Sequence, residues 1–344
     1  MSMLIDLMEM GLLPDTVIRR GIRRLLRQRL REEDHGDCEV NLLRQQMLFS
    51  TLRESPLSIC SDPAQSLRHG LPATFFSQVL GPRRSISCCL YPIGVNGIAA
   101  AEEAMLTEIC RRAELVDDMD ILELGCGWGS LTIWMAERYP SARITAVSNS
   151  QPQQEFIQTV CRESGYDNVR VVAAQMNTFE LEETFDRVIS VAMFEQMRNY
   201  AELLRRISCW LRPDGKLFAH LFCHRELAYL FDTEDEDNWM GRFFFTGGIM
   251  PSEQMLHYFN DNLIVENHWR VNGRHYQQTC EDWLTLLEAR DEQIMPILRD
   301  VYEDDAELWF QRWRVFFMAC SELFGYNSGN EWFVGQYLLQ QRRP

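Results

Sequence analysis

Lysine is almost absent from the chain. Of the 34 lysines and arginines among its 344 residues, Lys216 is the only lysine. It follows Pro213, Asp214 and Gly215, which are typical of a turn leading into a strand. Schiff-base enzymes need a reactive lysine, and P-loop NTPases need one after a glycine-rich loop. Neither class of enzyme is expected here.

The sequence also lacks cysteine pairs and long apolar runs. Its 11 cysteines contain no C-x-x-C pair and lie in apolar segments, as buried thiols do in a reducing compartment. Neither disulfides nor a metal site is indicated. The start carries Asp6 and Glu9 where a signal peptide would be basic, and no uncharged run approaches the roughly 20 apolar residues of a membrane span. These features predict a cytoplasmic protein.

Basic residues are fewer than acidic ones, 34 against 50, which gives a formal net charge of −16. Such a chain repels nucleic acid and acidic membranes, so neither is an expected partner. The exception is the stretch 16–31, which holds seven arginines and no acid. We interpret it as an amphipathic helix whose arginines are solvated or pair with acids in 232–237 and 303–307, rather than as a membrane anchor.

Length and patterning divide the chain into three zones. With 46% hydrophobic and 24% charged residues, it has the composition of a globular protein. Residues 1–115 show helical patterns without strand signals and predict an N-terminal helical cap, whose first helix follows Pro14. Residues 116–225 predict an α/β core. Residues 226–344 are rich in Trp and Phe and predict a substrate-binding lid of long helices that run nearly to the C-terminus, with closing strands.

The core zone alternates short β-branched runs with helical patterns, which predicts a parallel sheet. The predicted strands are residues 121–124, 142–147, 169–173, 187–191 and 217–222. A further strand-like segment, residues 263–269, interrupts the helices of the lid.

The strand at 121–124 runs into a glycine-rich turn with the spacing G-x-G-x-G, formed by Gly125, Gly127 and Gly129. Glycine lets the backbone approach a ligand closely and tolerates positive φ. The spacing departs from the dinucleotide fingerprint G-x-G-x-x-G, and Glu123 stands two residues before the first glycine. Here the sequence resembles the S-adenosylmethionine (SAM) dependent methyltransferases, in which this turn lies under the cofactor. The product would be S-adenosylhomocysteine (SAH).

The resemblance also indicates where the rest of SAM would bind. The family usually has a ribose-binding acid after its second strand, but this chain has none there, so Asn149 and Gln153 are the candidates through amide hydrogen bonds. After the third strand, Gln175 would reach the adenine amino group and Met176 would lie against the ring.

Segments on both sides of this core narrow the resemblance to the coclaurine N-methyltransferases and the related cyclopropane fatty acid synthases. The segments that carry it are Ser87-Cys88-Cys89 and residues 11–15, 193–200, 221–224, 244–252, 268–269, 273–276 and 322–332. They cover nearly the whole chain. The resemblance implies a class I SAM-dependent methyltransferase of the α/β class, Rossmann-like, with a mostly parallel seven-stranded sheet and helices on both faces.

The same resemblance implies roles for individual residues. Ser87 would touch the methionine end of SAM. In the cyclopropane synthases, the positions that surround a bicarbonate base match Cys88, Glu195, His220, Phe222 and Tyr276. In the alkaloid enzymes, the Glu and His of a Phe-Glu-His segment act at the substrate amine, beside an aromatic wall that matches Trp313 and Phe316.

This chain departs from the family pattern at four places. Gln196 replaces the histidine after Glu195, Ala192 replaces an acid, Ile86 replaces a tyrosine, and His69-Gly70 replaces a Tyr-Glu pair near the substrate entrance. An amide is not basic near neutral pH, so Glu195 is the predicted proton acceptor, with His220 or Tyr276 as a relay. The predicted substrate contacts are His69, Cys88, Gln196, Phe222, Trp313 and Phe316.

The resulting hypothesis is a SAM-dependent N-methyltransferase of a small aromatic or alkyl amine. One alternative is C-methylation or cyclopropanation of an unsaturated lipid. Another is a SAM-binding protein that has lost its chemistry, which the change at Gln196 permits. The sequence leaves the acceptor and the formation of a homodimer open.

Overall fold

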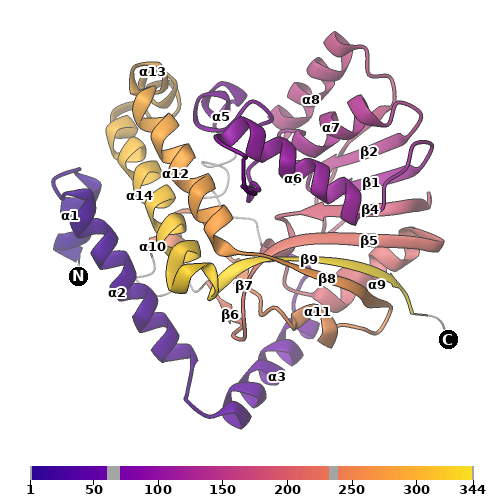
Figure 1. Cartoon of the computed structure of the whole chain (residues 1–344), viewed down its shortest axis with the longest axis horizontal. Helices are drawn as coiled ribbons and strands as arrows, with labels where there is room; N and C mark the ends of the chain where they lie inside the picture. The colour runs from indigo at the N-terminus through magenta and orange to yellow at the C-terminus, as the bar shows by residue number, and fades with distance from the viewer. Residues whose placement is uncertain (1, 60–69, 232–238, 343–344) are drawn as a thin grey trace.

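In the computed structural model, which describes residues 2–59, 70–231 and 239–342, seven strands form one sheet (Figure 1). These strands are β1 (Asp120–Leu124), β2 (Arg143–Ser148), β3 (Val169–Ala173), β4 (Phe185–Val191), β5 (Leu211–His224), β8 (Leu263–Val271) and β9 (Trp332–Gln341). Their order is β3-β2-β1-β4-β5-β9-β8. Neighbours from β3 to β5 are parallel, whereas β9 pairs antiparallel with β5 and β8. The predicted, mostly parallel seven-stranded sheet is confirmed.

The strand order reverses direction at β1. From β1 the chain winds outward to β2 and β3, then crosses back to place β4 on the other side of β1. In open α/β sheets, ligands bind outside the carboxyl ends of the strands at such a reversal. The glycine turn follows β1, and Glu195 lies in the short helix η1 (Phe194–Gln196) just after β4. Both motifs therefore reach the position where a ligand is expected.

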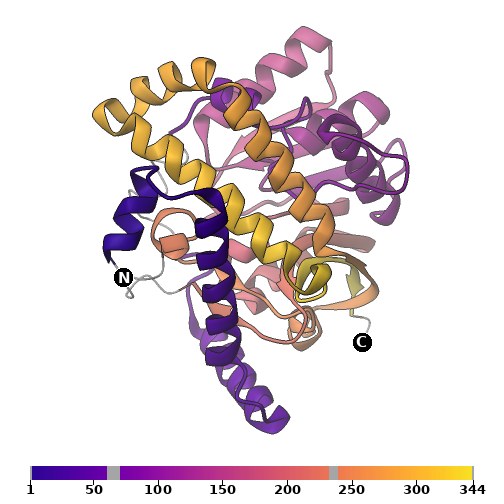
Figure 2. The same cartoon turned by 60° about the vertical axis from the view of Figure 1, so that its left-hand side comes forward.

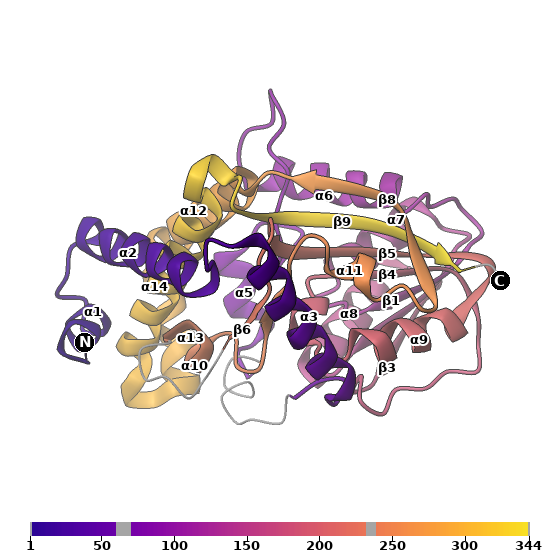
Figure 3. The same cartoon turned by 90° about the horizontal axis from the view of Figure 1, so that it is seen from below.

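Helices cover both faces of the sheet because alternate strand residues point to opposite sides (Figure 3). Ile121, Ile189 and Phe218 belong to a core that includes residues of α6 (Ile98–Arg112) and α7 (Ser130–Arg138). Leu122, Val188 and Leu217 belong to the core of the other face, which the following helices complete: α3 (Cys38–Glu54), α9 (Tyr200–Trp210) and α11 (Met255–Tyr258). Helix α8 (Gln151–Ser164) joins β2 to β3.

The lid lies beside the core and is mainly helical (Figure 1). Its helices are α10 (Trp239–Phe243), α12 (Gly273–Ala289), α13 (Asp291–Tyr302) and α14 (Ala306–Gly325), with the short strands β6 (Tyr229–Leu230) and β7 (Ile249–Met250). The N-terminal zone adds α1 (Ser2–Glu9), α2 (Asp15–Glu33) and α5 (Ala73–Val79). The zone boundaries at residues 115 and 225 stay a prediction.

Helix α2 contains the arginine-rich stretch and crosses α14 (Figure 2). Arg19 forms ion pairs with Glu281 and Glu322, and Arg23 pairs with Glu322. These two arginines therefore pair with acids, but not with acids of the two segments expected from the sequence. In the segment 303–307, Glu307 pairs with Arg299, and the segment 232–237 lies outside the described residues. Within the described residues, no helix is long and apolar enough to cross a membrane.

The five strands predicted for the core are present, but β9 is a correction. We expected the last part of the lid to be helical nearly to the C-terminus. Instead, residues 332–341 form a strand between β5 and β8. Its first eight residues are all buried. Because both faces are covered, the sequence shows no alternation of apolar and polar residues, and such a run cannot be told from a buried helix by periodicity.

Candidate active site

The glycine turn joins β1 to α7, and its three glycines have different surroundings. All have positive φ, +77° at Gly125, +53° at Gly127 and +76° at Gly129. A Cβ on Gly129 would lie 2.6 Å from Ile157 Cγ1 on α8, so this glycine permits close packing between helices. A Cβ on Gly127 would have no atom within 4 Å. The space over Gly127 is therefore open to a ligand.

A cavity of about 1100 Å³ lies at the carboxyl ends of the strands and continues between the core, the lid and α2. A cavity of this size has room for a nucleoside-type cofactor and a second small molecule. Most predicted site residues line it: Ser87, Glu123, Gly125, Gly127, Asn149, Gln153, Gln175, Met176, Glu195, Gln196, Phe222, Tyr276, Trp313 and Phe316. Segments more than 200 residues apart in the sequence therefore meet around one cavity.

Glu195 is a buried acid on the cavity wall, with 2% of its surface exposed. Its Oε1 accepts a hydrogen bond from the backbone N–H of Phe222 at 2.7 Å. Its Oε2 has no hydrogen-bond partner within the described chain. Burial raises the pKa of Glu195 to about 7, although the backbone N–H groups lower it. A carboxyl with one free oxygen and this pKa suits proton transfer near neutral pH.

His220 on β5 lies behind Ser87 and does not line the cavity. Gln336 Nε2 donates to His220 Nδ1 at 2.9 Å, which leaves the ring proton on Nε2 to donate to Ser87 Oγ at 2.9 Å. Arg112 fixes the Gln336 amide by donating to its Oε1 at 2.5 Å. Burial, with the nearby charge of Arg112, lowers the pKa of His220 to about 3. His220 is therefore placed to orient Ser87 as a neutral group, and its expected role as a proton relay stays a prediction.

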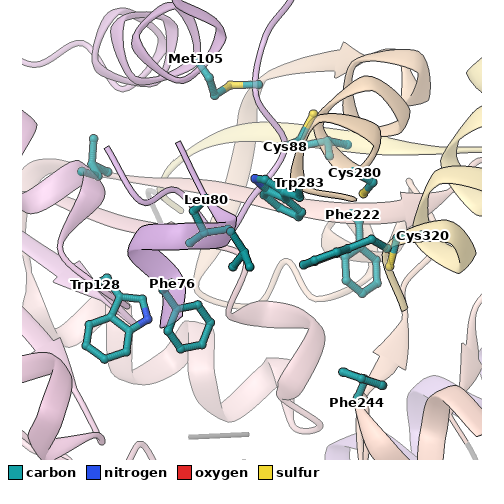
Figure 4. Packing of buried hydrophobic residues seen from close by; sticks show 14 of the residues in the cluster. Phe76, Leu80, Cys88, Met105, Trp128, Phe222, Phe244, Cys280, Trp283 and Cys320 are labelled. Carbon is teal, nitrogen blue, oxygen red and sulfur yellow. The ribbon is translucent and has the colours of Figure 1, made fainter. Parts of the chain in front are cut away.

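Aromatic rings form the wall on the lid side of the cavity. Trp313 and Phe316 on α14 have ring centroids 5.6 Å apart, and Phe244 stacks on Phe316 at 4.2 Å. Tyr276 stacks on Phe324 at 4.1 Å, and burial raises the pKa of its phenol well above the usual value. Tyr276 therefore stays neutral and cannot accept a proton from a substrate. Figure 4 labels Phe222, Phe244 and Cys320 among the residues of the core on this side.

The other predicted site residues lie away from the cavity or outside the described chain. Cys88 is fully buried, does not line the cavity, and donates its S–H to the Cys89 carbonyl at 3.2 Å. Gly129 packs on Ile157 instead of facing the cavity. The roles expected for these two residues stay predictions. His69 lies outside the described residues.

Comparison with known proteins shows the family. The sequence profile of the mycolic acid cyclopropane synthetases matches residues 65–332. The chain belongs to this family. (S)-Coclaurine N-methyltransferase of Thalictrum flavum subsp. glaucum is 35% identical over 344 residues, which cover 98% of this chain and 95% of that protein. The cyclopropane-fatty-acyl-phospholipid synthase of Escherichia coli (strain K12) is 25% identical over 251 residues, covering 72% of this chain and 61% of that protein.

Solved structures of family members give the same fold. The crystal structure of coclaurine N-methyltransferase bound to N-methylheliamine and SAH matches with a TM-score of 0.95 and 35% identity, covering 98% of this chain and 99% of that one. The cyclopropane synthase MmaA2 of Mycobacterium tuberculosis matches with a TM-score of 0.70 over 83% of this chain and 100% of that one, and its 20% identity supports the fold alone. The chain is a SAM-dependent methyltransferase, as the sequence predicts.

The residues around the glycine turn fit SAM. Trp128 Nε1 and Ser130 Oγ are buried at this turn without a hydrogen-bond partner in the described chain, as expected where a polar ligand binds. Glu123 accepts a hydrogen bond from Thr132 Oγ1 at 2.5 Å, and burial raises its pKa to about 8. Gln153 accepts from Ser148 Oγ at 2.8 Å through its oxygen, which leaves its amide N–H groups for a ribose hydroxyl. The role of each residue toward SAM stays a prediction.

Among the cavity-lining residues that sequence reasoning missed, three bear on ligand binding. Trp128 stands inside the glycine turn, and its indole N–H is the free donor just described. Trp283 on α12 also lines the cavity with a buried, unpaired indole N–H. Arg84 lies three residues before Ser87 on the same loop. The closeness of Trp128 and Arg84 to residues already singled out is the signal that could have found them.

Proposed function

We propose that this methyltransferase N-methylates a small amine, alkaloid-like or another aromatic or alkyl amine. The observation that carries the proposal is Glu195 Oε2, a buried carboxylate oxygen without a hydrogen-bond partner in the described chain, on the wall of a mostly apolar cavity. Bound SAM supplies a methyl group on a sulfonium, and the acceptor nitrogen needs a free lone pair to receive it.

The protonation of the acceptor requires a base. An aliphatic amine is mostly protonated at pH 7, so its proton must leave before or as nitrogen attacks. Glu195, with a pKa of about 7, can take that proton. Gln196 lines the cavity beside it but cannot act as a base, because an amide is not basic in this range. His220, whose ring nitrogens are both engaged, and neutral Tyr276 do not compete for the role.

The remaining groups position the reactants. Ser87, oriented by His220, would hold the methionine end of SAM, and Asn149, Gln153, Gln175 and Met176 its ribose and adenine. The aromatic faces of Trp313 and Phe316 would hold the amine and favour the positive charge that it carries before and after the reaction. Correct alignment of nitrogen, methyl and sulfur supplies much of the rate enhancement, up to roughly 7–11 kcal/mol in favourable systems.

Named relatives support an amine as acceptor. (S)-Coclaurine N-methyltransferase is a relative at 35% identity, and pavine N-methyltransferase of Thalictrum flavum subsp. glaucum is 30% identical over 343 residues. Their names specify transfer to nitrogen.

The ten described cysteines are free, which supports our proposal of a reducing, cytoplasmic location. A homodimer stays a prediction.

One feature of the cavity favours testing lipid as a second acceptor. The end of the cavity that α1 and α2 form is lined by apolar residues, among them Ile5, Met8, Val17 and Ile22. This end would also admit an acyl chain. Against this alternative, Cys88 and His220, two of the residues that match the bicarbonate site of cyclopropane synthases, do not line the cavity.

The test is to incubate the full chain with methyl-labelled SAM and separate panels of cyclic and acyclic amines, thiols, phenols and vesicles of unsaturated phospholipid. We expect label in an amine, identified as an N-methyl group by mass spectrometry, and its loss in the Glu195→Gln variant. Label in the phospholipid fraction, or in no acceptor class, would contradict N-methylation.

A further inference from the structure

The loop that carries Ser87 is clamped by a buried acid. Glu102 on α6 is completely buried, and its two carboxylate oxygens accept backbone N–H groups from Arg83 at 2.7 Å and Ser85 at 3.0 Å. Gly81 packs so closely on this carboxyl that a Cβ would collide with it. The carboxylate thus fixes the residues on both sides of Arg84.

Arg84 itself adopts a strained backbone. Its φ is +55°, in the left-handed region that non-glycine residues rarely occupy. Such a conformation persists only where surrounding contacts enforce it, and it is frequent at ligand sites. The Glu102 clamp supplies those contacts. It leaves the two neighbouring arginines in different environments, because Arg83 pairs with Glu103 and Glu137 at the surface, whereas Arg84 lines the cavity.

The Arg84 guanidinium lies at the cofactor end of the cavity. Its Nε donates to Ser77 Oγ at 3.0 Å, and its Cζ lies 4.7 Å from the centre of the Phe156 ring on α8. Phe156 contacts Trp128 of the glycine turn, with centroids 5.7 Å apart, and Trp128 also packs on Phe76 (Figure 4). Arg84 is therefore connected to the SAM-binding turn through a single aromatic ring.

The charge of Arg84 is not matched by a direct partner. No carboxylate of the described residues forms an ion pair with it, and burial lowers its pKa although Glu102 acts in the opposite direction. The methionine part of SAM carries a carboxylate, and a guanidinium matches its two oxygens in a bidentate pair.

We propose that Arg84 binds the carboxylate of the methionine portion of SAM. Its side chain reaches the cavity from the Glu102-clamped loop that also presents Ser87. The proposal concerns the cofactor and is independent of the acceptor, so it can hold or fail whichever substrate is methylated.

The test measures binding of two ligands to the full chain by isothermal titration calorimetry. SAH has the carboxylate, whereas 5′-methylthioadenosine lacks the whole amino acid part. The Arg84→Gln variant should bind SAH about 10- to 100-fold more weakly, the scale of a charge-assisted hydrogen bond, and should bind 5′-methylthioadenosine within twofold of the parent protein. Arg84→Lys should retain part of the SAH affinity. The matched control Arg83→Gln should change neither ligand.

A second measurement needs no variant. The parent protein should bind SAH at least tenfold more tightly than an SAH analogue whose carboxylate is replaced by a neutral carboxamide, and added salt should narrow the difference. Equal losses of SAH and 5′-methylthioadenosine in Arg84→Gln would assign a structural role to the residue. The proposal would be overturned if Arg84→Gln left the SAH affinity unchanged, or if the parent protein bound the carboxamide analogue as tightly as SAH. It would also be overturned if the only loss in Arg84→Gln were a higher KM for an amine that carries a carboxylate.

Discussion

At Glu195, the burial that would serve the proposed catalysis opposes folding stability. Its pKa is raised from 4.5 to about 7, so the folded state binds this proton more tightly than the unfolded state. The stability that comes from the protonated form is fully present below about pH 4.5. It is lost as the pH rises through about 7, where the folded protein carries a buried negative charge.

We therefore expect Glu195→Gln to stabilise the protein at high pH. The amide oxygen can still accept the N–H of Phe222, and the buried charge is removed. At pH 8 the free energy of unfolding should exceed that of the parent by on the order of 1–3 kcal/mol, and at about pH 4 the difference should nearly vanish. Urea unfolding followed by circular dichroism at both pH values measures this. A variant less stable than the parent at pH 8 would contradict an unpaired buried charge.

The glycine turn gives a second prediction at this scale. Gly127→Ala places a Cβ in the open space over the turn and costs about 1–2 kcal/mol of backbone strain at positive φ. It should weaken SAH binding at least tenfold in calorimetry while the protein still folds.

Gly129→Ala is the matched control, because its Cβ meets Ile157 inside the protein. This variant should lower the melting temperature more than Gly127→Ala does. Unchanged SAH affinity in Gly127→Ala would contradict the assignment of the turn.

Individual residues were predictable where a local motif carries them and not where a distant residue decides their state. Glu195 and the three glycines come from short motifs. The protonation of His220 depends on Gln336, which lies 116 residues later, and no local pattern reports it. The direction of the Arg84 side chain depends on a positive φ that Glu102 enforces from another helix.

At the scale of elements, α14 presents two tryptophans one turn apart to different environments. Trp313 lines the cavity, whereas Trp309 is buried against Tyr302 and does not line it. We expect Trp313→Phe to weaken amine binding about tenfold or more, with SAH affinity changed less than threefold, because truncating an aromatic hot spot typically costs about 2 kcal/mol. Steady-state KM for the amine and calorimetry with SAH measure the two effects.

Trp309→Phe is the control for this experiment, since it makes the same change on the same helix outside the cavity. It should lower stability with little effect on either ligand. If Trp313→Phe weakens both ligands equally, Trp313 is a packing residue and α14 does not select the amine.

Elements with a clear period were predictable, and elements buried on all sides were not. The strands of the core zone stand out as β-branched runs between helical patterns, and α2 shows its apolar stripe after Pro14. Strand β9 lies between β5 and β8 with both faces covered, so its sequence carries no alternation. Its position in the sheet depends on pairing with strands that lie far away in the sequence.

At the scale of the whole molecule, the winding of the sheet separates two tasks. In the proposed function, the loops after β1, β2 and β3 hold the cofactor, and α12, α14 and α2 close the acceptor side of the same cavity. Glu195, just after β4, stands between them. The class of fold was predictable from the motifs, because they carry the resemblance to the SAM-dependent methyltransferases. The extent of the cavity along α2 was not, because it depends on how the N-terminal helices pack on the lid.

The most direct test of the central claim is single-turnover methyl transfer to an amine of the class identified above, followed from pH 5.5 to 9 for the parent protein and Glu195→Gln, with both proteins saturated with SAM and amine. If Glu195 accepts the proton, the parent rate rises with pH around 7 as the carboxyl loses its own proton. The variant should be slower by about 100-fold or more at neutral pH and lack that rise. A Glu195→Gln enzyme with the parent's rate and pH profile would contradict the account.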